Sequence, residues 1–234
     1  MPYCPDCGTE AQPSFNYCSV CGKDLTGRSS TAAVEHLPQR LPSTLDYHIS
    51  VRRILLMSFL SHGLYLFYWF FLTWKQYRDH TGNPVFPVWH ALTLMVPVYS
   101  LFRTHAHMRT YKELMLNAGV TSTINVGLSV GLVFTSSVLD TVSFNLGGGF
   151  AGSTEISTGT AAATLFINLV SVAIVSGLLL HLQGNLNRYW HSLEAATIVD
   201  VKIGFSEGFL VFIGVFLWFD TVATLVNPAF LTGL

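Results

Sequence analysis

The chain has 234 residues, of which 50% are hydrophobic and only 11% are charged. Soluble domains usually carry about 25% charged residues, so this composition excludes an ordinary soluble domain and an acidic disordered chain. The 12 Lys and Arg are balanced by 13 Asp and Glu, which leaves no net basic field to hold a nucleic acid. We therefore expect a membrane protein whose main partner is the lipid bilayer, with no nucleic-acid partner.

Two C-x2-C pairs, ten residues apart, stand at the start of the chain: Cys4, Cys7, Cys18 and Cys21. A glycine follows each pair and lets the backbone turn its amides toward the sulfurs. This spacing predicts a structural Zn²⁺ site in a small zinc ribbon over residues 1–22, with four thiolate ligands and no open position for a catalytic water. So short a module has almost no core, so we expect the metal to supply its folding free energy, on the order of 10–16 kcal/mol.

Rubredoxin-type iron and a pair of disulfides are the alternative interpretations of these cysteines. No apolar signal peptide precedes them, which favours a reducing, cytoplasmic environment over an oxidising one. After the ribbon, residues 23–50 are rich in Ser, Thr, Pro and Gly and show no sustained periodicity. We expect them to form a flexible linker.

Beyond this linker the sequence predicts an all-α, multi-pass membrane bundle. A helix needs about 20 apolar residues to cross a bilayer, because its backbone polar groups must be satisfied internally. Five runs approach or exceed this length: 54–74, 85–102, 122–144, 160–182 and 208–230. The first two would form an aromatic-rich transmembrane hairpin over 51–115, and the other three would fill 116–234.

The first two runs are the weakest candidates for full crossing. Pro87 and Pro97 interrupt the second run, which is also the shortest, and a re-entrant hairpin is the alternative. Counted for five spans, the inner segments hold ten Lys and Arg, whereas the outer segments hold only Lys75 and Arg78. This positive-inside bias predicts a cell-membrane protein with a cytoplasmic N-terminus and an external C-terminus, and a re-entrant hairpin would leave the later helices unchanged.

Residues 53–112 resemble a prokaryotic membrane family known as domain of unknown function 4234. The resemblance rests on Gly63, on the aromatic cluster Tyr65, Tyr68 and Trp69, and on a proline-containing second helix that ends in basic residues. It covers about a quarter of the chain. His62 departs from the family pattern, which has Thr or another small residue there. The resemblance implies a zinc ribbon joined to a membrane domain, and it implies no activity.

Three polar side chains inside the predicted spans are candidate functional residues, because an ionisable group costs about 2.5–3.5 kcal/mol at membrane depth. Asp220 lies near the middle of the fifth span and could be a proton or cation site; the alternative is a hydrogen bond that packs two helices together. Asp140 lies nearer the outer boundary of its span. His62 could hydrogen-bond a kinked backbone beside Gly63.

Two further patterns concern packing. Gly127 and Gly131 belong to a stripe of small residues that would let another helix approach closely, either within the chain or in a homo-oligomer. Residues 182–193 repeat apolar side chains at helical spacing, which predicts an amphipathic helix along the inner membrane surface.

The sequence contains neither the H-E-x-x-H nor the G-x-S-x-G motif that would indicate an enzyme. We therefore do not expect an enzyme. Two functions remain. In the first, the chain is a membrane scaffold that binds a protein partner through its zinc ribbon. In the second, it is a proton-linked or small-solute transporter or channel that uses Asp220, which would require oligomerisation.

Overall fold

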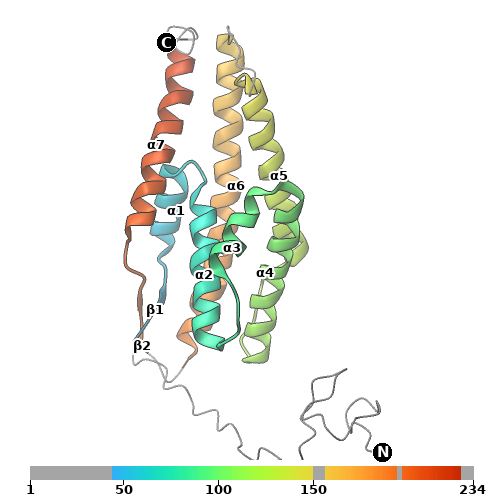
Figure 1. The fold of residues 1–234 in the computed structure, drawn as a ribbon, viewed down its shortest axis with the longest axis vertical. Helices are drawn as coiled ribbons and strands as arrows, with labels where there is room; N and C mark the ends of the chain where they lie inside the picture. Colours follow the sequence, from blue (N-terminus) through green and yellow to red (C-terminus); the bar gives the residue numbers. More distant parts are fainter. Residues whose placement is uncertain (1–43, 150–155, 194–196, 228–234) are drawn as a thin grey trace, which may run out of the picture. The chain divides into compact units, whose positions relative to one another are not determined.

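A computed structural model describes residues 44–149, 156–193 and 197–227, and these residues are mostly helical. Three helices are long and apolar enough to cross a membrane: α5 (Val126–Leu146), α6 (Thr158–His191) and α7 (Phe205–Val226) (Figure 1). They correspond to the last three predicted spans. The prediction of a helical protein with apolar spans is confirmed to this extent, but five spans are not supported.

The first predicted span, 54–74, is wrong because the chain reverses in its middle. Helix α1 (Val51–Leu60) has only ten residues, and α2 (Tyr65–Thr81) starts after a turn. His62 and Gly63 in this turn have positive φ angles of 54° and 84°, which no helix can accommodate. At about 1.5 Å per residue, α1 is about 15 Å long, half the thickness of a bilayer's hydrocarbon core.

The second predicted span, 85–102, is wrong because two prolines divide it. Pro87 begins α3 (Pro87–Leu92), a short 3₁₀ turn follows (Thr93–Met95), and Pro97 begins α4 (Pro97–Asn117). Proline suits the first turn of a helix, where its missing N–H is not needed, and it cannot continue the preceding one. Helices α1 and α2 thus form one short hairpin and α3 and α4 a second; we call these hairpin 1 and hairpin 2.

The two hairpins share an aromatic core with the C-terminal half of α6. The Nε1–H of Trp69 donates to Oε1 of Gln183 at 2.7 Å, and both side chains are buried. The ring of His107 lies 4.4 Å from that of Phe70. This core packs both hairpins against α6.

Helix α6 has 34 residues, which gives a length of about 51 Å. The predicted surface helix over 182–193 is therefore wrong: these residues continue α6 to its end at His191. Their apolar side chains meet other parts of the chain instead of lipid. Leu182, Leu186, Tyr189 and Trp190 are all buried.

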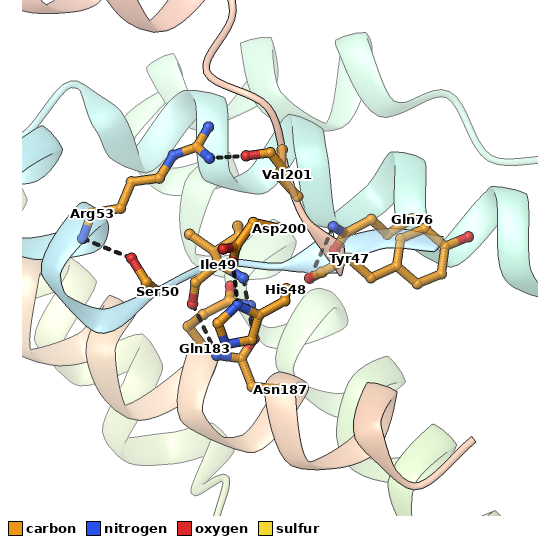
Figure 2. Close-up of polar contacts among 10 residues, drawn as sticks. All are labelled: Tyr47, His48, Ile49, Ser50, Arg53, Gln76, Gln183, Asn187, Asp200 and Val201. Atoms are coloured by element: carbon orange, nitrogen blue, oxygen red, sulfur yellow. Dashed lines mark hydrogen bonds and ion pairs between the residues drawn. The ribbon is translucent and has the colours of Figure 1, made fainter. Parts of the chain in front are cut away.

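Two short strands lie beside the end of α6. β1 (Thr44–His48) pairs in parallel with β2 (Thr197–Asp200), with Leu45 opposite Ile198. β1 occupies the last part of the predicted linker 23–50, so that part of the linker is regular structure. Asn187 of α6 extends the pairing, since its side-chain amide donates to the carbonyl of Ile49 at 2.9 Å (Figure 2).

The small-residue stripe of α5 does not face α6. The α5 side chains buried in the protein are Ser129, Val133, Ser136 and Ser143, at helical spacing along the opposite side. A Cβ added at Gly131 would meet no atom within 4 Å, and one added at Gly127 would meet only Asn125. Close packing within the described chain therefore does not explain the stripe, and a homo-oligomer through Gly127 and Gly131 stays a prediction.

Candidate functional site

The predicted zinc ligands Cys4, Cys7, Cys18 and Cys21 lie outside the described residues, so the zinc ribbon stays a prediction. Within the described ranges, no group of three or more His, Cys, Asp or Glu side chains could hold a metal ion. The site that the described residues do form is a polar cleft, and it contains two of the three candidate polar residues.

The cleft lies where the ends of both hairpins meet α5 and α6, and its volume is about 110 Å³. That volume has room for several water molecules. Hairpin 1 contributes its turn, hairpin 2 contributes Leu94 and Ser100, and α5 and α6 form the other wall. Its polar lining residues are His62, Ser100, Ser136, Ser137, Asp140 and Ser171. We call this site the tip cleft.

The tip cleft is level with the middle of α5. Its lining residues on α5 run from Val133 to Asp140, and Ser136 is the central residue of the helix. On α6 the lining includes Val172, which also approaches Gly63: a Cβ added there would lie 3.8 Å from Cγ2 of Val172. A bilayer crossed by α5 would therefore have the tip cleft near its centre, where polar groups are costly.

Asp140 is bonded across the seam between α5 and α6. The hydroxyl of Ser171 donates to its Oδ1 at 2.6 Å. One turn away the same seam contains a second polar pair, in which the hydroxyl of Ser143 donates to Oδ1 of Asn168. The Asp140 residue is exposed, so one carboxylate oxygen is fixed while the group can still exchange protons or bind a solute.

His62 faces Asp140's cleft from the turn of hairpin 1. Its Nε2 is buried and finds no hydrogen-bond partner within the described parts of the chain. Its ring packs against Trp218 of α7, with 4.4 Å between ring centroids. A non-glycine residue with positive φ is strained, and such strain persists where the surroundings enforce it, often at functional sites. The imidazole is thus held at the lining of the cleft, with one buried nitrogen that no described group bonds.

Helix α7 holds the turn of hairpin 1 in place. Nε1–H of Trp218 donates to the carbonyl of Phe59 at 2.7 Å, and the two aromatic rings stack. Beside this contact, Gly214 lies against the backbone of Leu60 and Ser61 so closely that a side chain at position 214 would have no space. The position of His62 therefore depends on α7 as well as on α1.

The start of α1 is fixed by a buried ion pair with α7. Nε–H of Arg53 donates to Oε1 of Glu207 at 3.0 Å, and the Glu207 side chain is fully buried. Further N–H groups of Arg53 donate to the carbonyls of Val201 and Lys202 (Figure 2 shows the bond to Val201). Helix α1 is thus anchored to α7 at both of its ends.

Asp220 is not part of the tip cleft. It lines a separate, smaller cavity of about 50 Å³ together with Gly147, Thr164 and Thr224. That cavity lies near the beginning of α6. Asp220 itself is six residues from the end of α7. The sequence singled out Asp220, Asp140 and His62 together, whereas the structure brings only the latter two to one site.

The serines of the tip cleft were not predicted from the sequence. Ser136, Ser137 and Ser171 are ordinary residues for a membrane helix, where a hydroxyl bonds readily to the preceding turn. Their convergence depends on the register of α5 against α6 and on how far the hairpins reach. The available signal was weak: the spacing of Ser129, Ser136 and Ser143 at seven-residue intervals on one face of α5.

Comparison with known proteins adds no template for this site. No protein-family model, curated protein or solved structure matches the chain. The resemblance of residues 53–112 to domain of unknown function 4234 therefore stays a prediction, and the function must be argued from the chemistry of the tip cleft.

Proposed function

We propose that this chain is an integral membrane protein that passes protons through the tip cleft. The carrying observation is that an imidazole with an unbonded nitrogen and a carboxylate line one small polar cleft level with the middle of α5. A carboxylate and an imidazole can each take up and release a proton near neutral pH when their surroundings shift their affinities. The hydroxyls of the cleft would hold water between them.

The distribution of charge supports a cytoplasmic position for the end of each hairpin that lies opposite its turn. Of the three apolar helices, only α6 carries a Lys or Arg, and that residue, Arg188, lies in its last turn. Lys75 and Arg78, which five spans would put outside, belong to the end of α2. There, the neighbouring Gln76 bonds the carbonyl of Tyr47 in β1. By the positive-inside rule this end faces the cytoplasm and the end of α7 faces outward.

In this orientation, the turns of both hairpins would lie at the tip cleft, near the middle of the bilayer. Both hairpins would enter from the cytoplasmic side and reach half-way, and non-spanning structure at that depth is tolerated where it is buried in protein or lines a water-filled cavity. Asp140 and His62 would be the two ionisable groups of the tip cleft. Proton transfer would then run between Asp140 and His62.

The test is proton flux into liposomes that contain the purified full-length protein and a pH-sensitive dye. We expect Asp140→Asn to abolish flux, because Asn keeps the shape and the bond to Ser171 but cannot carry a proton. Asp220→Asn is the matched control, an identical change on α7 outside the cleft, and should leave flux intact. His62→Asn should also reduce flux, since Asn tolerates positive φ and removes only the imidazole.

Unchanged flux in a folded Asp140→Asn protein would overturn the proposal, as would equal losses in Asp140→Asn and Asp220→Asn. A wild-type protein that conducts no protons under either polarity of pH gradient would do the same.

A second candidate function, a scaffold that binds a protein partner through the N-terminal zinc ribbon, is favoured by the spacing of the four cysteines. Here the ribbon would be cytoplasmic and the membrane helices its anchor. The test is a pull-down with the full chain in detergent: a partner that is captured by the wild type and released by Cys4→Ser supports this function. A partner retained by Cys4→Ser contradicts it, and zinc analysis of both proteins checks the ligand assignment.

A further inference from the structure

A second cleft, far from the tip cleft, lies between the start of α1 and the segment that joins β2 to α7. Its volume is about 400 Å³. Ser50, Arg52 and Leu56 line it from the α1 side, and Asp200, Val201 and Ile203 line it from the other. We call it the basal cleft. It is large enough for a phosphate group and its neighbouring atoms.

The charged groups of the basal cleft are not equivalent. Arg53 is already saturated by Glu207 and two backbone carbonyls. Arg52 is exposed, and no carboxylate in the described ranges bonds to it. Asp200 carries the only negative charge in the lining, and the His48 ring bonds its carboxylate. Lys202, next to the lining residue Val201, adds a second exposed cation without a carboxylate partner among these same residues.

The apolar part of the basal cleft continues along the protein surface toward the bilayer centre. Leu56 and Ile203 are 60% and 68% exposed, so both present apolar surface outside the protein core. From Leu56 the exposed apolar face of α1 continues through Phe59 and Leu60. A ligand bound here would therefore have its charge beside Arg52 and an apolar chain along α1.

The height of the basal cleft fits a lipid headgroup. Arg52 is in the first turn of α1, and Ile203 lies two residues before the first residue of α7. The start of an apolar membrane helix is where the headgroups of one leaflet lie, and basic pockets at the cytoplasmic side recognise anionic headgroups. The hydroxyl of Ser50 and the carboxylate of Asp200 could bond hydroxyl groups of the same headgroup.

We propose that the basal cleft binds the headgroup of an anionic phospholipid of the cytoplasmic leaflet, with its phosphate at Arg52 and an acyl chain along Leu56. The ligand class follows from the combination of a free cation, hydroxyl-bonding groups and an apolar face. This site is independent of proton passage through the tip cleft.

The experiment uses the full-length protein in nanodiscs of phosphatidylcholine alone or mixed with phosphatidylglycerol. Native mass spectrometry counts the phosphatidylglycerol molecules retained after mild delipidation, and thermal unfolding measures the stabilisation they give. We expect Arg52→Gln to weaken phosphatidylglycerol binding roughly fivefold, the factor that corresponds to one basic residue near an anionic surface. Lys202→Gln should act in the same direction.

Lys112→Gln is the matched control, because it removes a partly exposed cation of α4 elsewhere in the protein and should leave retention unchanged. Equal losses for Arg52→Gln and Lys112→Gln would overturn the proposal, since they would indicate diffuse attraction to a charged surface. Retention that is the same for phosphatidylcholine and phosphatidylglycerol would also overturn it. So would inorganic phosphate that competes fully with the lipid, because the apolar face of α1 would then contribute nothing.

Discussion

Gly214 is the position at which a single methyl group should displace the turn of hairpin 1. A Cβ there would lie well inside contact distance of three backbone atoms, Ser61 C, Ser61 Cα and Leu60 O. Carbon atoms touch at about 3.5–4.0 Å, so the turn would have to move by about 1 Å or more. Backbone atoms cannot rotate away as the end of a side chain can. Overpacking of this kind costs about 1–3 kcal/mol.

Replacing a glycine within a helix by alanine also stabilises the helix by up to about 1 kcal/mol. Gly208→Ala isolates this second effect, because it changes the same helix where a Cβ meets nothing within 4 Å. We expect Gly214→Ala to unfold several degrees below wild type in a thermal scan, at about 2–4 °C per kcal/mol for a chain of this size. Gly208→Ala should match or exceed wild type. Equal unfolding temperatures for the two variants would refute the steric clash at position 214.

Two further predictions concern buried charge. Glu207→Gln should destabilise the protein by about 3 kcal/mol in chemical denaturation, because it leaves the guanidinium of Arg53, only 10% exposed, without a counter-charge. His107 is fully buried, and burial lowers its pKa to about 3, with the neighbouring His90 adding to the shift. Its unfolded pKa is about 6.5, so the unfolded state binds more protons between pH 6.5 and 3, and stability should fall by about 2 kcal/mol on going from neutral pH to pH 5. His107→Phe should lose less stability over the same pH range.

Each of these predictions has its own control. Glu113→Gln breaks an exposed pair with Arg109 on the surface of α4 and should leave the denaturation midpoint unchanged. A Glu207→Gln protein as stable as Glu113→Gln would contradict the importance of the buried pair. For His107, unfolding is followed in detergent at pH 7.5 and pH 5, and parallel losses in wild type and His107→Phe would show that other groups cause the pH dependence.

The three apolar helices could be predicted from the sequence because each is a long run without internal charge. The first two spans could not, since a count of apolar residues treats Tyr65, Trp69 and Trp74 as lipid-facing. The structure uses them as a core between short helices. The information that breaks these runs was present in Gly63, Pro87 and Pro97, which are single residues that lower the mean apolarity of a 20-residue window very little.

The strands and the tip cleft depend on contacts between distant parts of the chain. Thr44 pairs with Thr197, and neither neighbourhood has the length or alternation that marks a strand. In the sequence Asp220 has the stronger claim, since it lies nearer the middle of its predicted span than Asp140 does. What separates them is which side of α5 packs on α6 and where the turn at His62 ends, and both are set by packing.

The pairing of β1 with β2 also limits where the chain can be shortened without harm. The polypeptide from Ser43 onward forms one compact unit, so removing everything before it preserves the pairing. A cut at the end of the predicted linker, before Val51, would delete β1, expose the backbone of β2 and leave the side-chain amide of Asn187 without Ile49 as its acceptor. For expression of the membrane part alone, the useful start is therefore several residues earlier than hydropathy suggests.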